Sequence, residues 1–515
     1  MENKFDNKSW IKKLNMKLFP PSLKDNTGDV DRLIKEINKA GPEIVNISFQ
    51  HLQTLSGKLR KAKYQVEAVL YEDQNSWHLI DVFACNGPEK IHVIAMDLGS
   101  STVVLRLINL ENHETIGETT FHNPQIEIGS DILTRIHHAA GEGGLEELRS
   151  ILINKINEEI IKLAQEYGIE IKMIIGMAVA GNTTMTHLFL GLDPYWLCRE
   201  PYIPVVNSPG IIKAQELCLS INPAAPVLVF PNVGSYFGGD LIAGILASDI
   251  IHQEQISFLV DVGTNAEVVI GNRDWLMGCA GAAGPALEGG VADMGMMAGP
   301  GVIDKVAIDP LTSEIKIRTI GLHPPVGICG SGLIDLVAQL FLAGMLDLRG
   351  KYRSKCGSLL KEINGIKHLE IVSSHDSGTN KELTISQIDI DGLIRSKAAM
   401  YTILTTIANT VNIPLNEIKR FFVAGTFGSY IDPKSAITIG MIPDLPLESY
   451  ISLGNTSLKG AAMAILSRQA KKEIHKIRDS ITYLELNVNQ EFMNLFSAAK
   501  FIPHTDSNLF PSVKM

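Results

Sequence analysis

A strand–turn–strand pattern that occurs twice is the feature that most constrains how this chain folds. The first copy, residues 94–105, reads IAMDLGSSTVVL, and the second, residues 258–270, reads FLVDVGTNAEVVI. In each copy an apolar strand ends at an aspartate, Asp97 or Asp261, and a turn with glycine and a small hydroxyl residue follows. The two aspartates are 164 residues apart, which is the length of one domain. The repeat therefore predicts a duplicated α/β core.

The residues of these turns indicate phosphate binding. Glycine lets the backbone approach a ligand closely, and successive N–H groups with hydroxyl groups can hold phosphate oxygens. The aspartate would repel a phosphate, so we expect it to bind, often through water, a Mg²⁺ that bridges the phosphates. Two ordinary β-turns explain each copy but not the repetition, so we predict paired subdomains that close on one nucleotide. The predicted phosphate-binding residues are Gly99, Ser100, Ser101, Thr102, Gly263, Thr264 and Asn265.

Three further glycine-containing turns support this prediction. Gly330, Ser331 and Gly332 open an apolar helix, where backbone donors and the helix dipole suit an anion or an adenosine. Residues 421–428 form an apolar strand that runs into a turn, and residues 181–185 follow the apolar strand 173–180. Taken singly, each turn is better explained as a tight connection in an α/β sheet, but their order favours nucleotide binding. In the turn after residue 424, the predicted nucleotide-binding residues are Gly425, Thr426 and Gly428.

The first 90 residues differ in pattern from the rest of the chain. A helix is expected over residues 29–40, with Asp29 able to cap its start and Gly41 suited to its end. A second amphipathic stretch spans residues 47–61, and two alternating segments, 64–71 and 77–83, predict strands. This is a small α+β module in which we find no catalytic residues. We predict three domains, at residues 1–90, 91–254 and 255–515, the last with a C-terminal tail.

Composition excludes several classes of protein. The chain has 46 Lys and Arg against 56 Asp and Glu, and a net charge of −10 argues against a binder of nucleic acid or anionic membrane. No two of the six cysteines have C-x₂₋₄-C spacing, which excludes a zinc ribbon, a ferredoxin-type cluster motif and a disulfide scaffold. The apolar segment 326–348 contains Asp335 and Gln339, so we expect a buried helix there and not a membrane span. A cytoplasmic protein is expected.

Several segments resemble motifs of known families. Residues 97–102, 261–265 and 424–428 are similar to the first phosphate, second phosphate and adenosine motifs of the actin, sugar-kinase and heat-shock-chaperone ATPase superfamily. That resemblance implies two ribonuclease-H-like subdomains around a Mg-nucleotide cleft. From residue 91 onward the chain more specifically resembles the reductive activators of corrinoid proteins, and residues 1–90 resemble the linker domain of that family. The segments that carry this closer resemblance are 122–136, 181–185, 283–289, 454–461, 483–486, 501–506 and 510–513.

The resemblance implies an activity and roles for individual residues. Members of the family use ATP to restore cob(II)alamin on a corrinoid methyl-carrier protein to cob(I)alamin, and they form homodimers. Asp97 and Asp261 are expected to hold Mg²⁺ and position water. Asp240 begins an apolar helix where chaperone ATPases place an acidic residue that orients or deprotonates the attacking water, although it is equally well explained as an N-cap. Glu288 is a weaker candidate for that role, and Asp131 either contacts the metal or caps the helix 132–138.

Two departures from the family pattern change the expectations. Family members commonly carry a [2Fe–2S] domain before the linker, and this sequence lacks cysteines with the required spacing. We therefore expect no bound iron–sulfur cluster and an electron from a separate ferredoxin or flavodoxin, while a role restricted to remodelling the corrinoid protein stays open. Met297 stands where the family usually has arginine, which leaves the role of its loop open. The alternative functions are a small-molecule kinase of the same superfamily and an ATP-sensing scaffold of a methyltransferase system.

Overall fold

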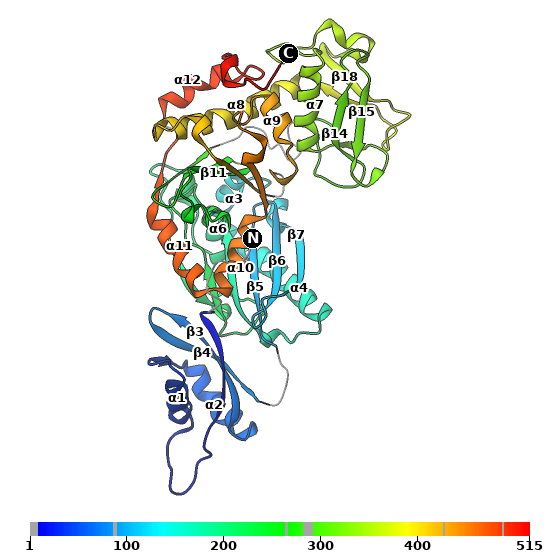
Figure 1. Cartoon of the computed structure of the whole chain (residues 1–515). Helices are drawn as coiled ribbons and strands as arrows, with labels where there is room; N and C mark the ends of the chain where they lie inside the picture. The colour runs from blue at the N-terminus through cyan, green and yellow to red at the C-terminus, as the bar shows by residue number, and fades with distance from the viewer. Residues whose placement is uncertain are drawn as a thin grey trace. The chain divides into compact units, whose positions relative to one another are not determined.

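The computed structural model describes residues 9–85, 90–262, 266–281, 292–425, 428–486 and 489–514 (Figure 1). The chain divides into two compact units. Unit 1 contains residues 1–247 and 457–479, and unit 2 contains residues 248–456 and 480–515. The chain thus leaves unit 1, builds most of unit 2 and then returns to unit 1 with a short helical segment.

The N-terminal domain of unit 1 is a four-stranded sheet with two helices (blue in Figure 1). Leu33 and Ile37 of one helix and Leu55 and Leu59 of the other are buried in one apolar core with residues of the sheet. This confirms the predicted α+β module. The helices are α1 (Asp29–Lys39) and α2 (Phe49–Lys61), and the sheet has the order β1 (Ile11–Lys17), β3 (Gln65–Asp73), β4 (Ser76–Ala84) and β2 (Val45–Asn46).

The expected capping role of Asp29 is wrong. Helix α1 has Gly28 as its N-cap residue, and no side chain caps the helix. The Asp29 carboxylate instead accepts a hydrogen bond of 2.6 Å from the Ser56 hydroxyl and one of 3.1 Å from the Tyr64 hydroxyl. Asp29 therefore joins the two helices and the sheet.

Trp10 attaches the N-terminal domain to the helical segment that returns to unit 1. Its side chain is fully buried, and its indole N–H donates a hydrogen bond of 2.8 Å to the carbonyl oxygen of Ala464 in α10 (Thr456–Leu466). The Lys471 ammonium of α11 (Arg468–Ser480) lies 4.4 Å from the centre of the indole ring. Burial of the indole with a satisfied N–H makes this a strong anchor.

The first six-stranded sheet lies in unit 1. Its central strand β5 pairs antiparallel with β6 and parallel with β8, and β8 pairs parallel with β10. The order is β7 (Thr115–His122), β6 (Thr102–Asn109), β5 (His92–Leu98), β8 (Ile174–Gly181), β10 (Pro226–Val229) and β9 (Gly210–Lys213). The helices of this part are α3 (Ile132–Ala139), α4 (Gly144–Glu166), α5 (Thr183–Leu190) and α6 (Gly239–Ser248).

The second six-stranded sheet lies in unit 2 and repeats this arrangement. Its central strand β11 is the first strand of a three-stranded antiparallel meander and has two parallel strands on its other side, as β5 does. The predicted duplication is therefore confirmed. The order is β21 (Tyr450–Gly454), β20 (Arg420–Ala424), β11 (Ser257–Val262), β12 (Ala266–Gly271), β13 (Leu276–Gly281) and β22 (Ile481–Tyr483).

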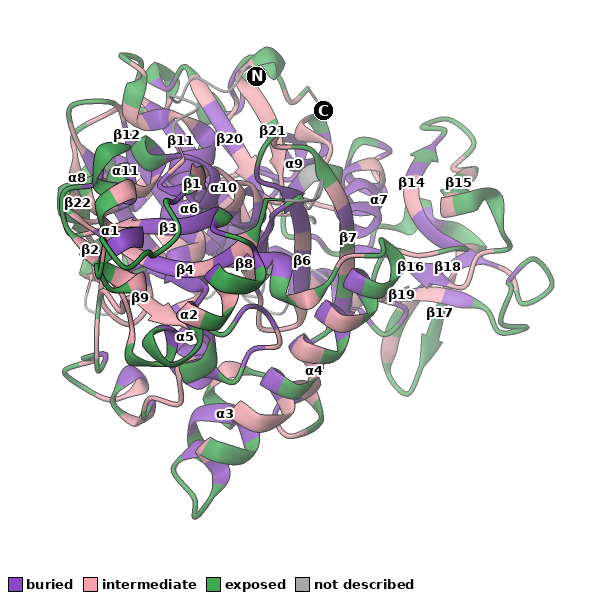
Figure 2. Ribbon diagram, turned by 90° about the horizontal axis from the view of Figure 1, so that it is seen from below, coloured by how far each residue is buried: buried purple, intermediate pink, exposed green. Residues whose placement is uncertain are grey.

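Two small sheets and a buried helix separate β13 from β20 in the sequence. Helix α7 (Gly330–Leu342) is buried over most of its length, as Figure 2 shows, which confirms the expected buried helix. Over the ranges that the structure describes, no helix is long and apolar enough to cross a membrane. The strands are β14 (Val302–Ile308), β15 (Ile315–Thr319), β16 (Gly327–Ile328), β17 (Leu360–Ile363), β18 (Ile366–Val372) and β19 (Leu383–Ser386), and the remaining helices are α8 (Gln387–Thr410), α9 (Pro433–Thr438) and α12 (Gln490–Ala499).

Lys397 of α8 holds the C-terminal segment of unit 2. The side chain is almost fully buried, and its ammonium donates hydrogen bonds to the carbonyl oxygens of Phe501 and Pro503, the latter at 2.7 Å. Carbonyl oxygens satisfy the donors but do not neutralise the charge. Burial therefore lowers the pKa of Lys397 from 10.5 to about 7.

Lys397→Met is expected to change how stability depends on pH. Between pH 7 and 10.5 the unfolded wild-type chain binds one more proton at this lysine than the folded chain does, so stability rises with pH there. The variant lacks this contribution, which amounts to at most about 1.4 kcal/mol per pH unit. Urea unfolding of both proteins at pH 7, 8 and 9 measures the difference. Parallel stability curves would contradict the assigned pKa shift.

Candidate functional site

The predicted residues of unit 1 meet at the edge of the sheet where its parallel strands end. Asp97 lies at the end of β5, Asn182 follows β8, and Asp240 lies in the first turn of α6, which follows β10. A Cβ atom added to Gly238 would lie 2.5 Å from the Cα of Asn182, so the start of α6 touches the end of β8. Open α/β sheets bind ligands at this edge.

A buried asparagine fixes the Gly99–Thr102 turn, which links β5 to β6. The Asn123 backbone N–H donates a hydrogen bond of 2.9 Å to the Ser101 carbonyl oxygen, and its side-chain amide donates one of 3.0 Å to the Gly99 carbonyl oxygen. Asn123 is only 1 % exposed, so these bonds are protected from water. The sequence interpretation used this segment only as part of the family resemblance and missed its role.

Asp240 has a raised pKa. Its carboxylate accepts a hydrogen bond of 2.8 Å from the Leu241 N–H, but α6 begins at Gly239, so Asp240 is not the N-cap residue. Burial of the carboxyl group, with the nearby negative charge of Asp97, raises the pKa of Asp240 to about 7. A base is most effective when its pKa is close to the working pH.

The Asp97 carboxylate fits a magnesium ion. Its negative charge is one cause of the raised pKa of Asp240, and a divalent cation held at Asp97 would offset that charge. Mg²⁺ is usually bound by one or two carboxylates together with phosphate oxygens and water.

Asp131 caps a helix. It is the N-cap residue of α3, and its carboxylate accepts hydrogen bonds of 2.9 Å from the Thr134 N–H and 2.6 Å from the Thr134 hydroxyl. Capping therefore explains its position without a metal.

Other predicted residues lie outside the described ranges, and these are Gly263, Thr264, Asn265, Glu288 and Thr426.

The second set of predicted residues meets at the corresponding edge of the sheet of unit 2. Asp261 lies near the end of β11 and pairs across the parallel ladder with Ala424 of β20. Gly425 follows directly, and its backbone N–H donates a hydrogen bond of 3.0 Å to the Gly454 carbonyl oxygen at the end of β21. The second aspartate and the predicted adenosine turn thus lie on neighbouring strands.

Unit 2 also contains a cavity of about 710 Å³ at the start of α7. Gly330 and Ser331 line it, whereas Gly332, Gly425 and Gly428 do not. Its volume lies in the range of small-molecule sites. The sequence interpretation missed most of its walls, which include Met296, Lys305, Arg318 and Tyr430, and Met297 also lines it with 58 % of its surface exposed.

A buried carboxylate, that of Asp335, links elements beside this cavity by hydrogen bonds. Asp335 of α7 accepts a hydrogen bond of 2.7 Å from the Val306 N–H in β14 and one of 2.6 Å from the Ser435 hydroxyl in α9. Val306 follows Lys305, and Ser435 lies in the helix after Tyr430, so Asp335 connects α7 and β14, which line the cavity, with the helix that follows its Tyr430 wall.

Asp335→Ala is expected to destabilise unit 2 by about 1–3 kcal/mol, because it leaves the buried Val306 N–H without this acceptor, whereas the Ser435 hydroxyl can still donate to the Asp432 carboxylate at 3.1 Å. Asp335→Asn keeps one acceptor oxygen and should lose about half as much. Chemical denaturation measures both losses. Equal stability of wild type and Asp335→Ala would show that water replaces the carboxylate and that Asp335 does not hold the cavity.

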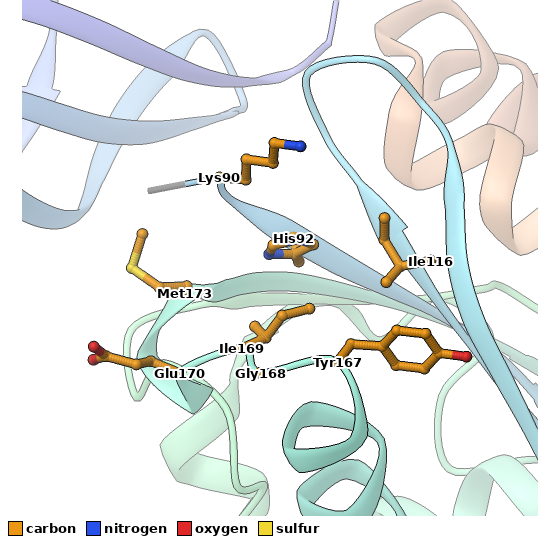
Figure 3. Close-up of a pocket in the computed structure, with 8 residues that line it drawn as sticks. All are labelled: Lys90, His92, Ile116, Tyr167, Gly168, Ile169, Glu170 and Met173. Carbon is orange, nitrogen blue, oxygen red and sulfur yellow. The ribbon is translucent and has the colours of Figure 1, made fainter. Parts of the chain in front are cut away.

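A second cavity, of about 370 Å³, lies in unit 1 at the start of β5 (Figure 3). Figure 3 shows Lys90, His92, Tyr167 and Glu170 among the side chains around it. His92 begins the strand that ends at Leu98, just after Asp97, so the cavity is at the end of β5 remote from the candidate site. It contains none of the predicted residues.

The two sheets share one order over five strands. Each has an aspartate near the end of its central strand and glycine turns at the same edge, and this arrangement defines the actin-like fold of the ASKHA superfamily. Three family descriptions match this chain in sequence: the RACo linker region at residues 1–87, the RACo middle region at residues 92–253, and the C-terminal domain of RACo, the ASKHA domain, at residues 255–514. The chain therefore belongs to the RACo family of reductive activators of corrinoid proteins.

Individual relatives agree with this assignment. The corrinoid activation enzyme RamQ of Eubacterium limosum is 30% identical over 81% of this chain and 72% of its own length. A reductase of Methanosarcina barkeri, named for a Co(II) methylated amine-specific corrinoid protein, is 24% identical over 78% of this chain and 75% of its own length. A solved structure of a reductive activator for a corrinoid, iron–sulfur protein has 37% sequence identity and a TM-score of 0.88, and covers 100% of this chain and 82% of that chain.

Proposed function

We propose that this protein is an ATP-hydrolysing activator of a corrinoid methyl-carrier protein in a methyltransferase system. In this role it supports the reduction of inactive cob(II)alamin to cob(I)alamin. The observation that carries the proposal is the duplicated sheet, with an aspartate and a glycine turn at the same edge of each copy, in a member of the RACo family. The printed names of the relatives, which refer to corrinoid activation and to reduction of a corrinoid protein, support the choice of substrate.

The candidate site suggests how each residue contributes to ATP hydrolysis. We assign phosphate binding to the Gly99–Thr102 turn, whose shape Asn123 fixes, and to residues 263–265 of the second repeat. Asp97 and Asp261 would hold Mg²⁺ through water, and the ion would neutralise phosphate charge when bound. Asp240 would orient the attacking water and accept its proton, a task that suits its raised pKa. The cavity beside Gly330 and Ser331 is the proposed adenosine site, with Tyr430 available for stacking.

ATP is needed because the reduction is unfavourable. For a one-electron step, each ~59 mV of uphill potential costs about 1.4 kcal/mol. The nucleotide can help only if it interacts differently with two conformations of the complex. We propose that ATP binding and hydrolysis change how the protein docks on the corrinoid protein and thereby alter the axial environment of the cobalt.

Several parts of the proposal concern partners and organisation. One electron per cobalt would come from an external ferredoxin or flavodoxin. We propose a cytoplasmic homodimer whose chains each contain a linker domain at residues 1–90 and two ATPase subdomains at residues 91–254 and 255–515. The RACo linker, middle and C-terminal regions, which match at residues 1–87, 92–253 and 255–514, support this division.

The deciding experiment combines the purified protein with a cob(II)-loaded corrinoid protein, a reduced ferredoxin and MgATP. The cob(II) absorption band is expected to decay to that of cob(I), and omission of ATP or ferredoxin should prevent this. Hydrolysis should be slow alone and faster with the corrinoid protein. ADP production driven by a metabolite without any protein partner would indicate a small-molecule kinase. Nucleotide-sensitive binding without turnover or cobalt reduction would indicate a scaffold.

A further inference from the structure

Arg135 of α3 is a buried cation with an incomplete set of partners. The residue is 0% exposed. Its Nε donates a hydrogen bond of 2.8 Å to the Gly129 carbonyl oxygen, and Nη1 lies 3.4 Å from the Gln125 side-chain oxygen. Nη2 is buried without a hydrogen-bond partner. Such a group is costly to bury, so its place in the fold calls for a reason.

Among the described residues, no carboxylate forms an ion pair with this guanidinium. The nearest acidic influence comes from Asp131, whose carboxylate is already bonded to Thr134. Burial lowers the pKa of Arg135 only to about 10, so the guanidinium stays charged at neutral pH. The interior of unit 1 therefore contains a permanent positive charge that no described residue compensates by a direct ion pair.

One side chain, that of Met185, separates Arg135 from Asn123, the residue that holds the Gly99–Thr102 turn. Its Nη1 is 3.2 Å from the sulfur of Met185, and the Asn123 amide nitrogen is 3.8 Å from the same sulfur. A second connection runs through the loop, because the Gln125 N–H donates a hydrogen bond of 3.0 Å to the Asn123 side-chain oxygen. Arg135 thus contacts Gly129 and Gln125 of the segment 123–129 directly, and it reaches Asn123, which holds the turn, through Met185 and Gln125.

Arg135 is also the source of positive charge in this cluster. The side chains and backbone groups joined by these bonds belong to residues that are otherwise uncharged, apart from Asp131 at the outer edge. A fixed positive charge in a region of low dielectric raises the affinity for anions nearby and needs no reorganisation when they bind.

We infer that Arg135 is a positioning residue that fixes the Gly99–Thr102 turn through Asn123 and supplies the positive charge behind it for the phosphate chain of a nucleotide. This inference rests on the proposed function, since it assumes that the turn binds phosphates. It predicts that the loss of Arg135 weakens binding more as the negative charge of the ligand increases. The loss of a residue needed only for folding would weaken the binding of all ligands alike.

The test compares wild type with Arg135→Gln for three probes: Mg-AMPPNP, Mg-ADP and adenosine. Dissociation constants are measured by calorimetry, or by competition for the weakest ligand. The variant is expected to bind Mg-AMPPNP about tenfold or more weakly, Mg-ADP less so, and adenosine within about twofold of wild type. Arg135→Lys keeps the charge and should recover part of the lost affinity. Arg106→Gln is the matched control, because Arg106 lies in β6 of the same sheet and pairs with Glu118 at the surface.

The deciding quantity is the ratio of Mg-AMPPNP to adenosine affinity. If Arg135→Gln leaves this ratio at the wild-type value, whether both affinities fall or neither does, the inference is overturned. Should Arg135→Gln not fold, Arg135→Lys decides by the opposite criterion: it keeps the charge, so a ratio close to the wild-type value supports the inference and a fall of about tenfold or more overturns it. A wild-type protein that binds none of the three probes overturns the proposed function as well, and thus separates the two failures.

Discussion

Asp240→Asn is expected to lower the rate of ATP hydrolysis by about 10²–10⁴-fold, the usual contribution of a general base. It should also stabilise the nucleotide-free protein at pH 8 by about 1–2 kcal/mol. Both effects have one cause. Burial and the charge of Asp97 disfavour the ionised carboxylate, which raises the pKa of Asp240 to about 7, so an uncharged amide of the same shape fits the empty site better. Steady-state kinetics and thermal unfolding measure the two effects.

Asp131→Asn is the matched control for this prediction. Asp131 also precedes a helix of unit 1, but it caps that helix, and asparagine caps a helix as well as aspartate. The control should leave the hydrolysis rate unchanged and should not stabilise the protein, because hydrogen bonds to Thr134 lower the pKa of Asp131 and its ionised form therefore stabilises the fold. If Asp240→Asn hydrolysed ATP within threefold of the wild-type rate, Asp240 would not be the base. A loss of stability in Asp240→Asn would show that the Asp240 carboxylate has a structural role.

Gly460→Ala is expected to separate the two helices that pack behind the candidate site of unit 1. A Cβ atom at position 460 would lie 2.3 Å from the carbonyl oxygen and 2.6 Å from the Cα of Ala243 in α6. Backbone atoms cannot turn away as a side chain can, so α6 and α10 must move apart. We expect a loss of about 1–3 kcal/mol from overpacking. Because α6 carries Asp240, a shift on the order of 1 Å should also lower the hydrolysis rate by about 10²-fold.

Gly57→Ala, the same substitution at another glycine, is expected to raise stability where Gly460→Ala lowers it. Gly57 lies inside α2, where an added Cβ meets no atom within 4 Å. Alanine should therefore stabilise this helix by up to about 1 kcal/mol and leave hydrolysis unchanged. Unfolding curves and initial rates for both variants give a direct comparison. Equal effects of the two substitutions would contradict close packing of α6 on α10.

Local sequence patterns were sufficient to predict most of the fold. The apolar strands before Asp97 and Asp261 lie at the centres of two sheets, and the alternating segments near the N-terminus form β3 and β4. These predictions depend on neighbouring residues, whose periodicity reflects which face of an element is buried. The return of residues 457–479 to unit 1 has no such local signal, since it depends on packing against residues hundreds of positions away.

The candidate site was predictable only where its residues follow strands directly. Asn123 reaches Gly99 across 24 residues, and Ser435 reaches Asp335 across 100 residues. Contacts of this kind leave no periodic trace in the sequence. The comparison of Asp131 with Asp240 shows a second limit. Both aspartates precede apolar helical stretches, but only Asp131 is an N-cap, because glycine at position 239 lets α6 start one residue earlier.

The anchor at Trp10 has a consequence for folding during synthesis on the ribosome. The indole and its partner at Ala464 are 454 residues apart, so Trp10 must wait for its acceptor while nearly the whole chain is synthesised. At about 5–20 residues per second this takes roughly 20–90 s. During that time the surfaces that receive α10 and α11 stay uncovered on the nascent chain, which makes unit 1 a natural client for chaperones that shield apolar surface during translation.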